Sequence, residues 1–258
     1  MPRRGKAMDW GRAKMILIVS FFILNAVLGY QLWTTRSDLL EFDANTTSAA
    51  EEIQRLLKSK NIQISAELPK EVPRLKEIVV RFTEPGNSKK QINLEIPFKY
   101  NPLVSKGSSK DNVAARTAIP NLDKYQYDPV TSTNEQYVFH QLYGTLPMFE
   151  VRLELIEQNG LVTAYRQGYV EDQLTGAQKE QKVISSYTVL RSLIETYFPS
   201  GSVVSSIKLG YHGQEFDSQT MFLVPYWRVT LGNGDVYYVH AFNGAVEPPQ
   251  KNKSNAAG

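Results

Sequence analysis

The 258-residue chain contains no cysteine. Disulfide bonds, thiol chemistry and a lipid-modified cysteine anchor are therefore excluded. A folded domain without disulfides is more typical of a bacterial surface than of a eukaryotic secretory protein. An excess of charge is lacking as well, because the net charge is +3 and part of it comes from a basic N-terminal segment. The rest of the chain is close to neutral, which gives no support for nucleic-acid binding.

Histidine is scarce, and His140, His212 and His240 have no second histidine or acid at a metal-ligand spacing such as HExxH. The first and last fall in expected strands and His212 falls in an expected Gly210–Gly213 turn, so each is interpreted as structural. The GxSxG and P-loop patterns are absent. No nucleophile–base pair can be assembled, so a cell-wall hydrolase or transferase is the least favoured class. We expect no catalytic residue, cofactor or metal.

Other short patterns have simpler explanations than chemistry. Ser205 and Lys208 match SxxK, but that chemistry needs the two side chains one helical turn apart, and this segment is expected to be a strand. Asn45 opens a glycosylation sequon that serves more simply as a helix cap. Many of the 14 tyrosines fall in expected strands. They either fill sheet faces or form an aromatic groove for a glycan or peptide, and packing is the favoured interpretation.

Long uncharged runs are rare, and the one from Met15 to Leu32 dominates the N-terminal part. As a helix it spans about 27 Å, close to the hydrocarbon core of a bilayer. We therefore predict a cytoplasmic tail at 1–14 and a transmembrane helix at 15–33. A cleaved secretory signal ending near Gly29 is the alternative, but the run is longer than a signal core and lacks the Ala-x-Ala pattern.

The charges on either side of the run predict its orientation. Five basic residues and one acid precede it, whereas acids predominate after it. Cytoplasmic flanks retain an excess of Lys and Arg, so the N-terminus should lie inside and everything after the span outside. The topology anchors are two basic residues and three aromatic residues at the expected interfaces: Arg12, Lys14, Trp10, Tyr30 and Trp33.

The extracytoplasmic part is predicted to be α+β, with antiparallel sheets each packed by a helix. Apolar spacing predicts one helix that ends at Asn61 and another from Gln181 to Phe198. Asn159-Gly160 separates two alternating runs, the strongest short signal for a hairpin. Two similar lobes are one alternative. The expected boundaries are a stalk at 34–47, a first lobe at 48–100, a connecting loop at 101–134, a second lobe at 135–247 and a loose tail at 248–258.

The segment Met8–Gln31, MDWGRAKMILIVSFFILNAVLGYQ, resembles the start of the YycI (WalI) family. These are membrane-anchored regulators of the WalK–WalR (YycG–YycF) cell-wall two-component system of low-GC Gram-positive bacteria. Because Met8 opens the similar segment, either the first seven residues are an extension or translation starts there. The residues that carry the resemblance are Met8-Asp9-Trp10, Lys14, Leu24-Asn25 and Gly29-Tyr30-Gln31.

The resemblance implies a non-enzymatic regulator that associates with the sensor histidine kinase and a YycH-type sister protein through the membrane helix. Asn25 lies near the middle of the apolar span, where an unpaired amide is costly and a partner helix satisfies it. Ser20 and Gly29 offer small surfaces for close approach, and only Gly29 shares a face with Asn25. A bond to the helix's own backbone, or a homodimer, is the alternative.

The C-terminal segment Leu223–Glu247 is similar to the end of a PepSY-type module. A strand with tryptophan, a turn, an aromatic strand and a final Asn-Gly turn carry this likeness. It implies a second class of function, an extracytoplasmic ligand-binding or protease-inhibiting module for which the helix is only a tether. The sequence identifies no ligand for such a module.

Overall fold

A computed structural model describes residues 10–44, 46–84, 90–100, 117–173, 179–215, 219–247 and 249–251. The choice between Met1 and Met8 as the start lies outside the described residues. So do most of the predicted cytoplasmic tail, part of the predicted connecting loop and most of the predicted loose tail.

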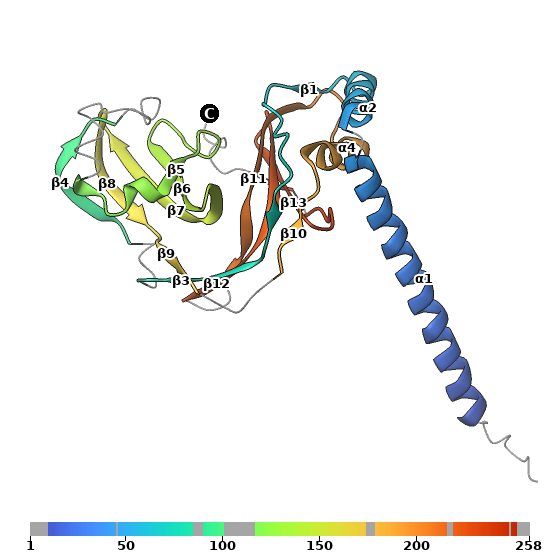
Figure 1. The fold of residues 1–258 in the computed structure, drawn as a ribbon. Helices are drawn as coiled ribbons and strands as arrows, with labels where there is room; N and C mark the ends of the chain where they lie inside the picture. Colours follow the sequence, from blue (N-terminus) through green and yellow to red (C-terminus); the bar gives the residue numbers. More distant parts are fainter. Residues whose placement is uncertain are drawn as a thin grey trace, which may run out of the picture.

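Helix α1 (Trp10–Ala44) carries the predicted membrane span and projects from the rest of the protein as a long rod (Figure 1). Within it, Lys14–Gln31 has a mean hydropathy of 1.6 over 18 residues, and none of this window is buried. The described chain thus has one N-terminal helix that is long and apolar enough to cross a bilayer. The predicted stalk is helical too, because α1 continues to Ala44 and α2 (Thr46–Ser59) begins two residues later.

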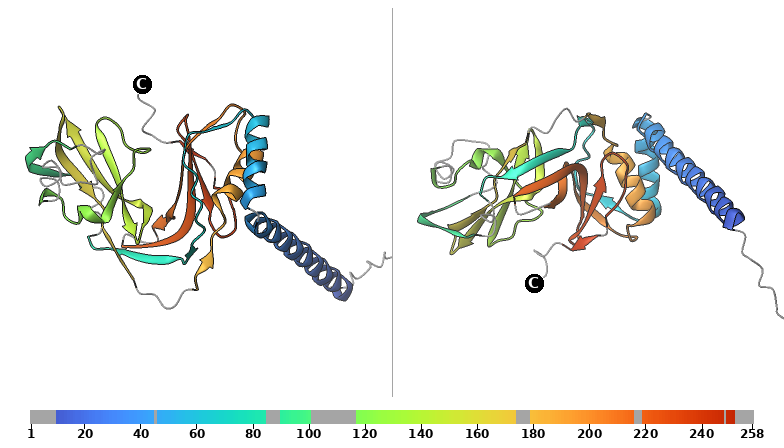
Figure 2. Two further views of the ribbon diagram at one scale, coloured as in Figure 1. Left: turned by 45° about the horizontal axis from the view of Figure 1, so that its top comes forward. Right: turned by 90° about the horizontal axis from the view of Figure 1, so that it is seen from below.

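Twelve strands of the described chain form one sheet with two halves that we call wings. Strand pairing joins them at a single parallel residue pair, Tyr211 with Met148, and the Gln141 side chain of one half also hydrogen-bonds the Val170 backbone of the other. Figures 1 and 2 show the wings set at an angle to each other, with the helices beside only one of them. The helix-covered wing comprises β1 (Gln63–Ile64), β3 (Ile78–Phe82), β9 (Val170–Asp172), β11 (Val203–Glu215), β12 (Thr220–Leu231), β13 (Asp235–His240) and β14 (Gln250–Lys251). The outer wing comprises β4 (Ile92–Phe98), β5 (Tyr125–Tyr127), β6 (Gln136–Tyr143), β7 (Leu146–Gln158) and β8 (Leu161–Gln167).

The structure confirms the α+β class, and it interleaves the segments 48–100 and 135–247 that were expected as two lobes. Strand β1 pairs in parallel with β11, β3 pairs antiparallel with β12, and β4 pairs antiparallel with β8. The earlier segment therefore supplies strands to both wings. The two segments share one sheet, and the lobe boundaries stay a prediction.

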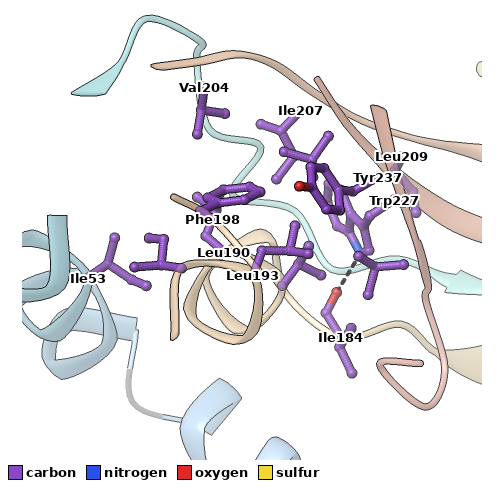
Figure 3. Close-up of a cluster of buried hydrophobic side chains, with 14 of the residues drawn as sticks. Ile53, Ile184, Leu190, Leu193, Phe198, Val204, Ile207, Leu209, Trp227 and Tyr237 are labelled. Atoms are coloured by element: carbon purple, nitrogen blue, oxygen red, sulfur yellow. Dashed lines mark hydrogen bonds between the residues drawn. The ribbon is translucent and has the colours of Figure 1, made fainter. Parts of the chain in front are cut away.

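Helices α2 and α4 cover the same face of the helix-covered wing. Ile53 of α2, Leu190 and Leu193 of α4 (Ser186–Thr196), and Trp227 of β12 are at most 2% exposed and belong to one cluster (Figure 3). The Trp227 indole N–H donates to the Ile184 carbonyl oxygen at 3.0 Å, which satisfies its polar atom inside the core. Burial of large apolar side chains, each contributing about 1.5–3 kcal/mol, fixes the helices on this wing.

The helix expected from Gln181 to Phe198 is shorter, which corrects the prediction at its N-terminal end. Gln181–Lys182 forms strand β10, which pairs antiparallel with β2 (Arg74–Leu75). The hydroxyl of Ser185 accepts a hydrogen bond from the Thr188 backbone N–H at 3.2 Å. This N-cap bond starts α4 at Ser186, because it satisfies a backbone donor that a helix start leaves unpaired.

Two turns predicted from asparagine are confirmed. Asn159 and Gly160 have φ of 54° and 79° between β7 and β8, the two positive values that a tight hairpin turn requires. Asn61, with φ 52°, follows α2 and ends it. At both places a local conformation that most residues avoid fixes the direction of the chain.

Candidate functional site

The predicted partner-helix face lies on the exposed part of α1. Successive residues of a helix are rotated by about 100°, so Asn25 and Gly29 lie about 40° apart around the axis, whereas Ser20 lies about 140° from Asn25. The structure thus brings Asn25 and Gly29 to one face and leaves Ser20 on another. An added Cβ at Gly29 would meet nothing within 4 Å, so this face is open for close approach of a second helix.

The Asn25 side chain already makes one hydrogen bond within α1. Its Nδ2 donates to the Phe21 carbonyl oxygen at 2.8 Å, the self-bonding alternative foreseen from the sequence. A primary amide has a second N–H and a carbonyl oxygen with two lone pairs. A bilayer supplies no water for these groups, so the face retains the chemistry needed to bond another helix.

The topology anchors lie at the two ends of the apolar window. Trp10, Arg12 and Lys14 occupy the first turns of α1, and Tyr30 and Trp33 lie around the far end of the apolar window. The Tyr30 side chain is 65% exposed, as an interfacial aromatic residue would be. The arrangement suits a single-pass span.

A second candidate site, which the sequence did not predict, is a polar interface between the wings. We call it the inter-wing interface. It is formed by side chains of both wings on the face of β11–β13 that is turned away from α2 and α4. Its residues are Asp128, His140, Phe149 and Glu150 from the outer wing, and Lys208, His212, Arg228 and Tyr238 from the helix-covered wing.

A buried ion pair lies at the centre of this interface. Arg228 Nη2 lies 2.7 Å from Asp128 Oδ2, and both side chains are 2% exposed. The guanidinium also sits 4.4 Å from the centre of the Phe149 ring, a cation–π contact. Lys208 approaches the same carboxylate at 3.5 Å. Charges removed from water need such partners, so the pair ties β12 to the outer wing.

His140 completes this cluster as a neutral ring. Its Nε2 lies 3.0 Å from Asp128 Oδ2. Burial lowers the pKa of His140 to about 4, although the bond to Asp128 opposes this shift. Burial alone would raise the pKa of Asp128, but the hydrogen bond with His140 and the charge of Arg228 hold it well below its usual range. The cluster therefore keeps one charge state, carboxylate with guanidinium, across the neutral pH range.

His212 forms the other polar contact of the interface, and it corrects a prediction. His212 lies within β11 and not in a turn, and its side chain is 13% exposed. Nδ1 bonds Glu150 Oε1 of β7, while Nε2 lies 3.1 Å from Glu247 Oε2. The ring also stacks on Tyr238 with centroids 3.9 Å apart and planes 9° apart.

The two glycines that suggested a turn serve close approach instead. A Cβ at Gly210 would lie 2.6 Å from the Phe149 ring and 2.6 Å from the Pro147 carbonyl oxygen. A Cβ at Gly213 would overlap the Phe222 carbonyl oxygen of the neighbouring strand. Glycine is needed here because β7 and β12 come too near to β11 for any side chain.

The remaining short patterns take structural roles. Ser205 lies in β11 and its hydroxyl donates to the Thr230 carbonyl oxygen at 3.0 Å, while Lys208 reaches Asp128. His240 Nδ1 accepts from the Phe242 backbone N–H at 3.2 Å. Four aromatic rings of the outer wing, three of them tyrosines, pack on each other with centroids 5.4–6.4 Å apart: Tyr100, Tyr127, Tyr137 and Phe139.

One signal in the sequence could have indicated the inter-wing interface. Arg228 stands in the apolar run YWRVTL of a predicted strand, and a charge in such a run needs an acid partner. The sequence does not say which acid, because Asp128 lies far away in the chain. Nothing marks His212 as a site either, since its two carboxylate partners come from different segments.

Comparison with known proteins identifies the family. No curated protein matches the chain. Among solved structures, an uncharacterized protein from Eubacterium rectale ATCC 33656 is 16% identical, with a TM-score of 0.26 over 52% of this chain, and the chain spans only 41% of its length. The family model described as YycI protein matches residues 41–242, most of the chain. The chain therefore belongs to the YycI family, which is a family of regulators of the WalK (YycG) two-component system and not a known enzyme family.

Proposed function

We propose that this protein regulates the sensor kinase WalK through α1, which pairs in the membrane with transmembrane helices of the kinase and of a YycH-type sister protein. Membership of the family supports the kinase partnership, and the physical support comes from α1 itself. Its apolar window makes no buried contact within the chain. A helical segment that is not packed against its own chain is free to pack against another helix.

The observation that carries this proposal is the polar group at the middle of the exposed window. Asn25 satisfies one N–H on Phe21 and offers its remaining amide groups next to Gly29, where a second helix can approach closely. Hydrogen bonds between membrane helices contribute about 0.6–2 kcal/mol. That is enough to set which helices pair and in which register, as a single buried asparagine does in coiled coils.

The proposal also includes an orientation. The basic residues before the span favour a cytoplasmic N-terminus, so both wings lie outside the cell membrane. The kinase helices and α1 then meet within the bilayer, and α2 and α4 sit next to its outer surface. Contact of α1 with both helices provides a physical connection between the span and the helix-covered wing.

The first test is the Asn25→Leu variant of the full-length protein. Because leucine keeps the helix apolar and removes the amide, we expect co-purification with the kinase to fall about threefold to tenfold, the range for a loss of about 0.6–1.4 kcal/mol. Ser20→Ala is the matched control, since it removes a polar group from another face and should leave co-purification unchanged. Equal recovery of the kinase with Asn25→Leu and wild type would refute the assigned face.

Crosslinking identifies the partner directly. A photoreactive residue at position 25 should capture a helix of the kinase or of the sister protein, identified by mass spectrometry. Capture of a second copy of this chain would support the homodimer instead. The same residue at position 20 should give little product, because that position faces away from Asn25.

A second candidate function is an extracytoplasmic ligand-binding or protease-inhibiting module for which α1 is only a tether. One observation favours it: the family match begins at residue 41, after the apolar window, and covers the wings. Replacement of residues 15–33 by an unrelated membrane span separates the two candidates. Loss of regulation would support a role for α1 in kinase regulation. Full regulation with the foreign span would support a tethered extracytoplasmic module.

A further inference from the structure

His212 is held by carboxylates on both sides of its ring. Glu150 belongs to β7 of the outer wing and bonds Nδ1. Glu247 belongs to the segment after β13 in the helix-covered wing and faces Nε2 at 3.1 Å. A carboxylate only accepts hydrogen bonds, and a neutral imidazole has a single N–H. Only the protonated ring donates to both partners at once, so the geometry selects the imidazolium form.

The surroundings of His212 also favour the imidazolium form. Glu150 carries an oxygen, Oε2, that is buried and has no hydrogen-bond partner among the described residues. The Glu247 backbone N–H donates to the Tyr238 carbonyl oxygen at 2.9 Å, so its position is fixed on β13. Tyr238 stacks flat on the imidazole ring. The nearest carboxylates thus hold a positive ring between them.

Every packed element contributes titratable or charged groups near this ring. The two tyrosines among them stay neutral at physiological pH. The carboxylates are the charges in direct contact with His212. By element, the groups are Glu150 and Arg152 of β7, Tyr226 and Arg228 of β12, Tyr238 and His240 of β13, and Glu247, with Glu77 near His240.

We propose that His212 is a proton-operated clasp between the two wings, closed when the imidazole is protonated and open when external alkalinisation removes that proton. Deprotonation leaves one N–H for two carboxylates, so one of the two bonds is lost. It also leaves both carboxylates facing a neutral ring, with Glu150 already short of a partner. The bond across the wings, His212 to Glu150, weakens as a result.

The pH direction follows from the shift of this histidine. Burial lowers the pKa of His212, but the hydrogen bonds and charges of Glu150 and Glu247 outweigh burial and raise it above 6.5. A raised pKa means that the stabilisation is complete below 6.5 and is lost as the pH rises through the folded-state value. The clasp therefore opens as the pH rises beyond the range in which an ordinary histidine titrates.

The neighbouring cluster provides a fixed point for this movement. Asp128 stays ionised over the same pH range, because the hydrogen bond with His140 and the charge of Arg228 lower its pKa, and His140 stays neutral, because burial lowers its pKa. The Arg228 guanidinium is always charged in proteins. The single strand pairing of Tyr211 with Met148 is also independent of pH. Opening at His212 thus changes the angle or the mobility of the wings about a permanent link and does not separate them.

The test measures the distance between the wings in the full-length protein in detergent micelles. The chain has no cysteine, so Gln54→Cys on α2 and Gln126→Cys on β5 accept spin labels without background. We expect the distance distribution to shift or broaden between pH 6 and pH 9. The shift should vanish in His212→Gln and persist in His240→Gln, the matched control on β13. Identical distributions at both pH values, or a shift that survives His212→Gln, would overturn the clasp.

A second measurement stays informative if His212→Gln folds poorly. With three histidines in the chain, their ring signals can be followed separately by NMR of the labelled protein. We expect the His212 signal to titrate above 6.5, and Glu247→Gln to move both this titration and the distance change to lower pH. A His212 signal that titrates at or below 6.5 would contradict the proposal. So would a distance change whose pH midpoint is the same in Glu247→Gln as in the wild type. Neither experiment depends on the kinase, so their outcome is independent of the proposed function.

Discussion

At the residue scale, the inter-wing interface depends on a few buried charges. Arg228 and Asp128 are both 2% exposed, and each is the main counter-charge of the other. Such a pair adds little net stability over a well-packed apolar pair, but removal of one member is severe because the other charge stays buried without compensation. The pair therefore acts chiefly to specify how the wings meet, since a shifted arrangement would leave both charges unpaired.

This asymmetry gives a prediction for Arg228→Met. We expect the free energy of unfolding to fall by about 3–5 kcal/mol, because the Asp128 carboxylate loses its closest cation. Urea unfolding followed by the fluorescence of buried Trp227 measures the change. The double variant with Asp128→Asn should lose less than the sum of the two single variants. Additive losses would mean that the two side chains are not energetically coupled.

At the element scale, the two wings depend on the close approach of β7 to β11. Phe149 of β7 rests against Gly210 of β11, and a Cβ at Gly210 would lie 2.6 Å from both the ring and the Pro147 carbonyl oxygen. The same ring lies under the Arg228 guanidinium. Glycine at position 210 is thus a condition for the contact between the wings, and its signal in the sequence was mistaken for a turn.

The element-scale prediction is that Gly210→Ala forces β7 and β11 apart. Overpacking of this kind costs about 1–3 kcal/mol, and the Pro147 backbone cannot move aside as a side chain would. Gly232→Ala is the matched control, because its added Cβ would meet Val203 at an ordinary 3.5 Å. Thermal unfolding of both variants checks this. Equal melting temperatures for the two alanine variants would show that the strands tolerate the extra atom.

The elements themselves were largely predictable, and the physical reason is that their signals are local. The Asn159-Gly160 hairpin and the end of α2 at Asn61 follow from residues that accept positive φ. The N-terminus of α4 was placed too early because apolar spacing continued past the Ser185 cap. Gln181–Lys182 forms a strand and not a helix because it pairs with Arg74–Leu75, and no local pattern encodes a partner so distant in the chain.

At the scale of the whole molecule, the chain joins a helix long and apolar enough to cross a membrane to two wings through one continuous series of contacts. Helix α1 touches α2 and α4, these cover the helix-covered wing, and that wing meets the outer wing at the inter-wing interface. The sequence predicted the apolar helix and the α+β class, but it did not predict which elements contact one another in this series. Strands from early and late segments share one sheet, and such long-range pairing depends on tertiary packing.

The orientation of this series across the membrane is the last prediction. Excess positive charge before the apolar window predicts a cytoplasmic N-terminus, so we expect a cysteine at position 54 to react with a membrane-impermeant maleimide in intact cells. A cysteine at position 6 should react only after the membrane is permeabilised. Labelling of position 6 but not of position 54 in intact cells would show that the orientation is the opposite of the predicted one. A labelled product found in the medium and trimmed near Gly29 would instead support a cleaved signal, and regulation through a resident α1 would then be ruled out.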